Sequence, residues 1–331
     1  MDVLSDVLRG VRLTGAVFLE LEAHSPWVGS TPISEIVGGL VMPEAEHVIS
    51  LHVLTAGSCW AELGDDSSLP IQLSAGDVVI IPKGHAHFLS SSPGMRGEPD
   101  LAVYHRPNGR SLPLPYVLNQ TAGGDESCHF VCGFLGCDRR PFNPLLDALP
   151  SLFHARASNA SRSWLSTLLD AAVDKTEEDS VGRETMLAKL AELLFVEVLR
   201  KHIGELPENS RGWLSGLRDP KIGRSLRLMH EQPTEDWTIE RLAREVGLSR
   251  SAFAERFVQY VGFPPMNYLA QWRMQLASRA LERPGISVAQ AAASVGYESE
   301  AAFRRAFERY VGVSPAAWRR HGVAVGHSED P

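Results

Sequence analysis

The sequence predicts a multi-domain α+β protein with a β-barrel or sandwich in its N-terminal part, a helical linker and an all-α C-terminal domain. Three observations carry this prediction. Short β-branched and aromatic runs, separated by Gly, Pro, Asp and Ser, fill residues 15–135. Apolar residues then recur at helical spacing up to residue 206. The last hundred residues contain an internal repeat typical of two helix-turn-helix units.

The N-terminal part shows several strand-like segments with turn residues between them. Their number and short spacing favour a closed or two-layered β structure over a parallel sheet. The segments are 35–42, 47–54, 58–63, 70–74, 77–82, 85–91 and 101–106.

The linker contains one wide apolar stripe at helical spacing. It runs through Met186, Leu190, Leu194 and Val198. A stripe this wide needs a partner, which is either the β-rich part of the same chain or the same helix in a second subunit. Both remain open at this point, and the second would make residues 163–206 a dimerisation region.

Charge is unevenly distributed along the chain. Residues 211–322 carry 17 basic and 11 acidic side chains, whereas residues 1–210 carry 15 basic and 27 acidic ones. A basic end on an acidic body indicates that this end meets a polyanion.

The repeat aligns residues 237–273 with residues 286–320. Thr238 and Ser287 stand where a helix N-cap belongs, and Gly247 and Gly296 stand where a left-handed residue turns the chain into a second helix. Phenylalanines in each second helix are expected in the core. The offset grows from 49 to 50 residues across the turn, so the second copy has one more turn residue.

Residues 220–321 resemble the DNA-binding domain of the AraC/XylS family of bacterial transcription regulators, through "VGYESEAAFRRAFERYVGVSPAAWRR" and the connecting helix "PPMNYLAQWRMQLASRALE". The resemblance implies that each second helix enters a major groove, with the two grooves roughly 34 Å apart. It leaves Arg273 and Arg279 as phosphate contacts or ordinary surface charges. By position, the groove-facing candidates are Arg250, Ser251, Ala254, Glu255, Glu300, Ala301, Arg304 and Arg305. An ion pair within the chain is the alternative role for Glu255 and Glu300.

The segment "GDVVIIPKGHAHF" resembles the second motif of cupins through Gly76, Pro82, Gly84 and His87. The resemblance implies a cupin-type β-barrel with His87 pointing inward. The first cupin motif departs from its usual pattern. His52, His85 and His87 are therefore candidate metal ligands, with ordinary hydrogen-bonded histidines as the alternative.

The whole arrangement resembles cupin-bearing AraC regulators, including a branch that responds to reactive chlorine species. That resemblance implies a sensing role for Cys132. The partner cysteine of that branch lies early in the cupin domain, where this chain has no cysteine before Cys59, so Cys59, Cys128 or Cys137 would have to substitute for it. The alternatives are a buried structural thiol and a zinc site that adds Cys137 and His129. The candidates for effector binding or redox sensing are Cys132, Cys128, Cys59, His52 and His87.

The sequence therefore predicts a cytoplasmic, sequence-specific DNA-binding transcription regulator, an activator by resemblance, controlled by a small effector or by thiol oxidation. The expected partners are double-stranded DNA, RNA polymerase, the effector or oxidant and a second subunit, without a membrane. The alternative is a metal-dependent cupin enzyme fused to a DNA-binding module. No hydrolase, P-loop or dinucleotide motif supports catalysis. The predicted boundaries are 1–140 for the sensor, 141–210 for the linker, 211–322 for the DNA-binding domain and 323–331 for the tail.

Overall fold

The computed structural model describes residues 2–65, 68–106, 112, 114–119, 127–156 and 182–325. The chain forms two compact units. The barrel unit comprises residues 13–137 and 149–205, and the helical unit comprises residues 1–12, 138–148 and 206–331. This division differs from the predicted boundaries because the first twelve residues and residues 138–148 belong to the helical unit. Residues 157–181 of the predicted linker and 326–331 of the tail lie outside the described residues.

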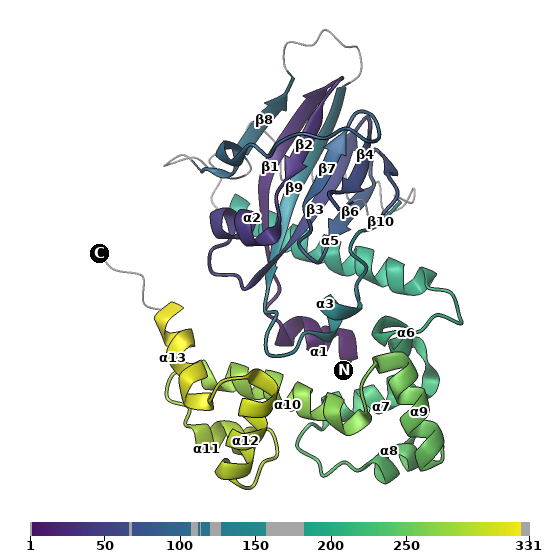
Figure 1. Ribbon diagram of the computed structural model, residues 1–331, viewed down its shortest axis with the longest axis vertical. Helices are drawn as coiled ribbons and strands as arrows, with labels where there is room; N and C mark the ends of the chain where they lie inside the picture. The colour runs from purple at the N-terminus through teal and green to yellow at the C-terminus, as the bar shows by residue number, and fades with distance from the viewer. Residues whose placement is uncertain are drawn as a thin grey trace. The chain divides into compact units, whose positions relative to one another are not determined.

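The barrel unit consists of two facing sheets (Figure 1). Both sheets contribute side chains to one apolar core, including Leu54, Leu63, Leu89 and Phe130. The predicted cupin-type β fold is confirmed. The six-stranded sheet has the order β10 (Phe153–Ala155), β6 (Val78–Ile81), β3 (His47–Ala56), β9 (Ser127–Cys137), β1 (Thr14–His24) and β8 (Leu114–Leu118); the four-stranded sheet has the order β2 (Val28–Thr31), β7 (His87–Ser90), β4 (Ser58–Leu63) and β5 (Ile71–Ser74).

Two of the predicted strands are helical. Residues 35–42 lie largely in helix α2 (Ser34–Val41), and residues 101–106 overlap the 3₁₀-helix η1 (Leu101–Tyr104). α2 buries Val37 and Gly38, and a Cβ added at Gly38 would lie 3.0 Å from Val48 on β3. Close packing on a strand therefore outweighs the β-propensity of this segment. At η1, the Asp100 side chain accepts from the Ala102 amide and starts the turn.

Most of the apolar stripe of the linker is buried within the chain's own barrel unit, whereas Met186 is exposed. Helix α5 (Arg183–Glu205) buries Leu190, Leu194 and Val198, and it packs on β1. A Cβ added at Gly15 on β1 would lie 2.2 Å from the Ala188 carbonyl oxygen, so only glycine allows this approach. Of the two partners left open by the sequence, the barrel of the same chain is the one that covers the stripe.

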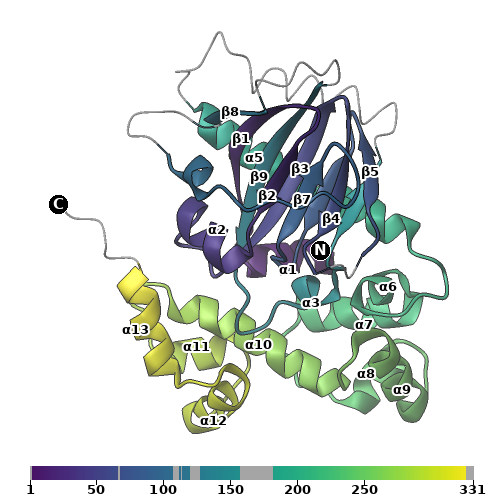
Figure 2. The ribbon, with the colours of Figure 1, turned by 45° about the horizontal axis from the view of Figure 1, so that its top comes forward.

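The helical unit contains the predicted repeat on either side of a connecting helix (Figure 2). Helix α10 (Pro265–Leu281) joins α8–α9 to α11–α12. The unit's other helices are α1 (Val3–Gly10), α3 (Pro144–Ala148), α6 (Trp213–Arg218) and α7 (Pro220–Glu231); the repeat itself comprises α8 (Ile239–Glu245), α9 (Arg250–Val261), α11 (Val288–Ser294) and α12 (Glu300–Val311), and α13 (Pro315–Val325) follows.

Capping and turn chemistry match the prediction in both copies. Thr238 accepts from the Arg241 amide, and Ser287 forms a capping box with Gln290. Gly247 and Gly296 have φ values of 65° and 81°. Helix α9 begins three residues after its turn glycine, whereas α12 begins four residues after Gly296. The extra turn residue of the second copy is confirmed.

The phenylalanines of the repeat form the cores of the two copies, as expected. Phe253 and Phe257 on α9, and Phe303 and Phe307 on α12, are fully buried. In the second copy, Met274 and Leu281 of α10 pack against the same cluster, so α10 is part of that core. Among the described residues, no helix has both the length and the apolar character needed to cross a membrane.

We expect Gly296→Ala to destabilise the helical unit more than Gly312→Ala. Both glycines have a positive φ, 81° and 84°, which costs another residue about 1–2 kcal/mol. Only at Gly296 would the added Cβ also meet backbone, 2.7 Å from the Thr234 carbonyl oxygen, whereas nothing lies within 4 Å at Gly312. Thermal unfolding of the full chain measures both changes. Equal losses would show that the Thr234 backbone yields without cost.

Candidate functional site

The second helices of the repeat present the predicted side chains on their outer faces. The inner faces carry the buried phenylalanines, which fixes the opposite side toward solvent. Of the eight candidates, Ala254 and Glu300 are half-buried; the exposed ones are Arg250, Ser251, Glu255, Ala301, Arg304 and Arg305.

Ion pairs divide these candidates into two groups. Arg304 pairs with Glu300 at 2.5 Å, so the intramolecular role foreseen for Glu300 is confirmed. Arg250 pairs with Glu240 of the preceding helix at 2.9 Å. Arg305 and Glu255 have no ion-pair partner among the residues that the structure describes. A guanidinium that is free of carboxylates can place all its donors on an external acceptor.

The arginines of the connecting helix are engaged within the helical unit. Arg273 donates to the carbonyl oxygens of Pro233 (2.6 Å) and Glu235 (2.8 Å). Arg279 lies 3.6 Å from carboxylate oxygens of both Asp138 and Glu282. Both side chains are less than fully exposed, and burial lowers the pKa of each. Both side chains therefore make contacts within the helical unit that the sequence did not predict.

Sequence reasoning missed a buried clamp on the connecting helix. Gln275 of α10 is fully buried. Its side-chain oxygen accepts from the Phe142 amide at 3.0 Å, and its side-chain nitrogen donates to the Gly10 carbonyl at 2.9 Å. One side chain thus ties the segments before and after the barrel to α10. A glutamine inside an apolar helix face is the one feature of the sequence that could have indicated this.

The same two segments are joined next to the clamp. The Asp138 amide donates to the Val11 carbonyl at 2.8 Å, and Arg12 donates to the Asp138 carboxylate at 2.6–3.0 Å. Along the chain, Arg12 leads into β1 and Asp138 follows directly from β9. The β1–β9 ladder, which pairs Thr14 with Gly136, therefore continues into the helical unit.

The barrel unit contains a cavity of about 80 Å³. This volume is several times the ~10–15 Å³ that one water molecule needs, so the cavity can hold a small molecule. Strands β1 and β9 form much of its wall. The lining residues are Leu19, Leu21, Val28, Gly29, Ser30, Thr31, His52, Leu89, Glu98, Asp100, Val103, Tyr104, Tyr116, Leu118, Phe130, Cys132 and Phe134.

A chain of three buried polar side chains ends at this cavity. His87 Nδ1 lies 3.0 Å from the His85 carbonyl oxygen, which can only accept, so Nδ1 carries the proton. Burial lowers the pKa of His87 to about 4 and holds that of His52 well below its usual value, so both rings are neutral at pH 7. His52 Nε2 must then donate to His87 Nε2 at 2.7 Å. The Cys132 thiol donates to His52 Nδ1 at 3.0 Å.

The candidate metal ligands do not assemble. His85 precedes β7 and faces Asp65 at 3.1 Å, whereas His87 is the first residue of β7; the expectation that alternation along one strand puts both imidazoles on one face is therefore wrong. The Nε2 atoms of His52 and His87 are hydrogen-bonded, closer than the ~3.3 Å that separates two nitrogens on one tetrahedral zinc ion. Within the described ranges, no three His, Cys, Asp or Glu side chains are placed to hold a metal ion. Of the three candidates, the structure brings His52 and His87 together and places His85 apart from them.

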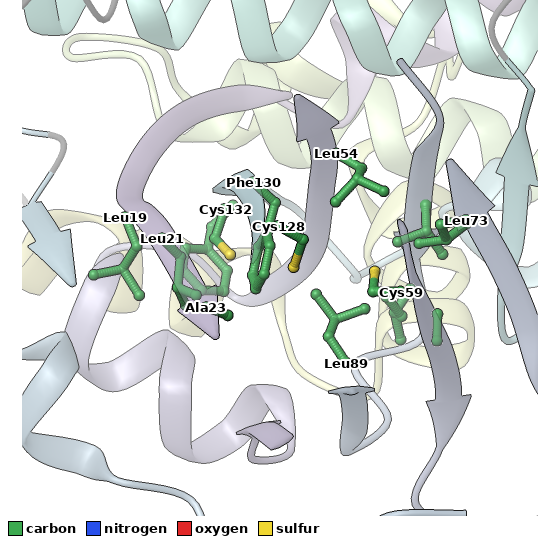
Figure 3. Close-up of a cluster of buried hydrophobic side chains, with 14 of the residues drawn as sticks. Leu19, Leu21, Ala23, Leu54, Cys59, Leu73, Leu89, Cys128, Phe130 and Cys132 are labelled. Carbon is green, nitrogen blue, oxygen red and sulfur yellow. The ribbon is translucent and has the colours of Figure 1, made fainter. Parts of the chain in front are cut away.

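The cysteines lie in the apolar core. All four are buried, and none forms a disulfide among the described residues. Figure 3 shows Cys59, Cys128 and Cys132 among leucines and Phe130, with Cys128 and Cys132 on the same strand face, as alternation predicted. Burial raises the pKa of the Cys128 thiol to about 12 and also raises those of Cys59 and Cys132. A thiol that stays protonated is a poor nucleophile.

Comparison with known proteins matches both units. A cupin family model matches residues 2–204, and a helix-turn-helix domain model matches residues 242–321. A putative AraC-like transcription regulator of Streptomyces lividans is 30% identical over 97% of this chain and 99% of its own length. The RCS-specific HTH-type transcriptional activator RclR of Escherichia coli is 28% identical over 82% of this chain and 84% of its own length.

Among solved structures, the DNA-binding domain of AdpA in complex with a target DNA is 32% identical, with a TM-score of 0.32, over 34% of this chain and 99% of that one. The relatives named above are transcription regulators and not enzymes, which removes the alternative of a cupin enzyme. The chain, with a cupin domain ahead of its double helix-turn-helix, belongs to the AraC family of DNA-binding transcription regulators.

Proposed function

We propose that this regulator reads DNA bases through the outer faces of α9 and α12, with Arg305 as the principal base-reading side chain. The observation that carries this proposal is that Arg305 is exposed on α12 and has no ion-pair partner among the described residues. An unpaired guanidinium can bind guanine O6 and N7 with two hydrogen bonds. Arg304 and Arg250, which are held by carboxylates, are better suited to phosphates once those pairs open.

We propose the barrel cavity as the effector site. Part of the cavity wall comes from β1 and β9, the two strands that lead along the chain to Arg12 and Asp138. A molecule that shifts these strands changes the position of Gly10 and Phe142, both bound by Gln275. Because α10 joins the two helix-turn-helix copies, this path supports control of their spacing. The raised pKa values of the three core thiols favour a bound effector over thiol oxidation as the input.

The proposed active form is a homodimer that activates transcription by recruiting RNA polymerase. Support for a dimer comes from α5, whose buried stripe leaves a second apolar row exposed. Met186 and Leu193, seven residues apart, are 48% and 52% exposed. Residues at this spacing lie on one helix face and suit a symmetric helix pair.

We expect Arg305→Ala to weaken specific DNA binding by about 1–3 kcal/mol, a 5- to 150-fold rise in Kd. Fluorescence anisotropy of the full-length protein on its own upstream DNA, at fixed salt, measures this. Arg200→Ala removes the same charge from the exposed side of α5, outside the helical unit, and should leave Kd unchanged. Equal, small effects of both variants would show that Arg305 reads no base.

We expect Gln275→Leu to free both segments from α10. It leaves the Phe142 amide and the Gly10 carbonyl unpaired, at a cost of about 1–3 kcal/mol in the free energy of unfolding. Amide hydrogen exchange should accelerate at Phe142 and across residues 3–10. Gln259→Leu, at an exposed site on α9, is the control. Unchanged exchange in both variants would show that the clamp does not hold these segments.

We expect Leu193→Glu to convert a dimer into monomers, because it places a charge in the middle of the exposed row of α5. Sedimentation velocity at several protein concentrations measures the change. Leu69→Glu introduces the same charge at a site that is 85% exposed and away from α5, so it should leave the dimer intact. A dimer that survives Leu193→Glu would move the interface to another surface.

A further inference from the structure

The charged members of the cavity lining are all acidic. Among the lining residues that the structure describes, Glu98 and Asp100 carry charge and no lysine or arginine is present. Both acids are exposed, which places them at the end of the cavity that opens to solvent. Neither has an ion-pair partner within the described ranges. The cavity entrance is therefore negative, and no described residue neutralises its charge.

The orientation of Asp100 is fixed. Its carboxylate accepts from the Ala102 amide at 3.0 Å and from the Tyr116 hydroxyl at 3.4 Å. Burial, followed by the charge of Asp100, raises the pKa of Tyr116, so this hydroxyl stays protonated and keeps donating. The Ala102 amide and the Tyr116 hydroxyl thus fix the orientation of the carboxylate, and no described lysine or arginine forms an ion pair with it.

The walls are aromatic and rigid. Tyr104 meets Phe134 edge-on with ring centroids 6.1 Å apart. Phe130 is stacked on Trp27 at 5.5 Å. Tyr116 completes the set of rings that line the cavity. The faces of such rings attract organic cations, and cages of aromatic rings are a common way of binding quaternary ammonium groups.

The polar groups of the buried end are already satisfied by one another. His52 accepts from Cys132 and donates to His87, and the Tyr104 hydroxyl donates to Thr31 Oγ1 at 3.4 Å. A bound anion would face two carboxylates at the entrance, and the described lining offers it no lysine or arginine. Burial of an unpaired charge of that sign is strongly unfavourable.

We propose that the barrel cavity binds a small organic cation, an amine or quaternary ammonium group with apolar substituents. The charge lies toward Glu98 and Asp100 and the apolar part against Tyr104, Phe130 and Phe134. This inference rests on the proposed role of the cavity as the effector site, and it names the chemical class of the effector.

Isothermal titration of the full-length protein with three probes of similar shape tests the proposal. The probes are choline, its neutral carbon analogue 3,3-dimethylbutan-1-ol and the anion 3,3-dimethylbutanoate. We expect choline to bind roughly tenfold or more tightly than the alcohol, and the anion not to bind. The double variant Glu98→Gln and Asp100→Asn, which keeps the cap of η1, should lose roughly tenfold in choline affinity and leave the alcohol unchanged.

Glu35→Gln with Glu44→Gln is the matched control, because it removes two exposed acids of the barrel unit that do not line the cavity. It should leave choline binding unaltered. Equal binding of choline and the alcohol, preference for the anion, or no binding of any probe would each overturn the proposal.

A separate DNA titration, with and without choline, distinguishes this inference from the proposed function. Choline binding that changes DNA affinity supports both. Choline binding without any change in DNA affinity retains the cation site and overturns the effector role. Loss of specific DNA binding in the absence of any probe would count against the proposed base-reading surface alone.

Discussion

The hydrogen-bonded ladder between β1 and β9 is the constraint on which the other features depend. It supplies much of the wall of the cavity, and α5 packs against β1. Where the two strands leave the barrel, the Val11–Asp138 hydrogen bond joins the segments next to them. Gln275 of α10 binds the same segments at Gly10 and Phe142. Because both strands leave the barrel side by side, neither can slide without breaking the register of the other.

The histidine of the second cupin motif belongs to a buried hydrogen-bond chain. His87 lies inside the barrel, as its motif implies, but its ring nitrogens are used by His52 and the His85 carbonyl. The result is a neutral hydrogen-bond chain that satisfies three buried polar groups without a counter-charge. The cavity wall at this end contains one imidazole, of His52, and one thiol, of Cys132, and both are already hydrogen-bonded.

The sequence was sufficient for features set by local chemistry. The caps at Thr238 and Ser287, the turns at Gly247 and Gly296 and the buried phenylalanines each depend on a few neighbouring residues. Features set by distant contacts could not be predicted in the same way. Residues 34–41 became helical because Gly38 allows close approach to β3, and His85 turned toward Asp65 because its strand begins two residues later. The assignment of residues 1–12 to the helical unit depends on Gln275, more than 260 positions away.

The single additional residue in the turn before α12 has a consequence for the DNA that this protein selects. The two copies are also unequal in their side chains. Arg250 and Ser251 lie at the start of the second helix of one copy. Glu300 and Ala301 lie at the start of the other, with Arg304 and Arg305 one turn later. Because the two helix-turn-helix copies differ, rotating the chain by half a turn does not exchange one copy for an equivalent one. A single chain therefore binds the double helix in a defined orientation. Each site that it occupies has a direction, and a promoter can use that direction to orient the protein toward or away from the start of transcription.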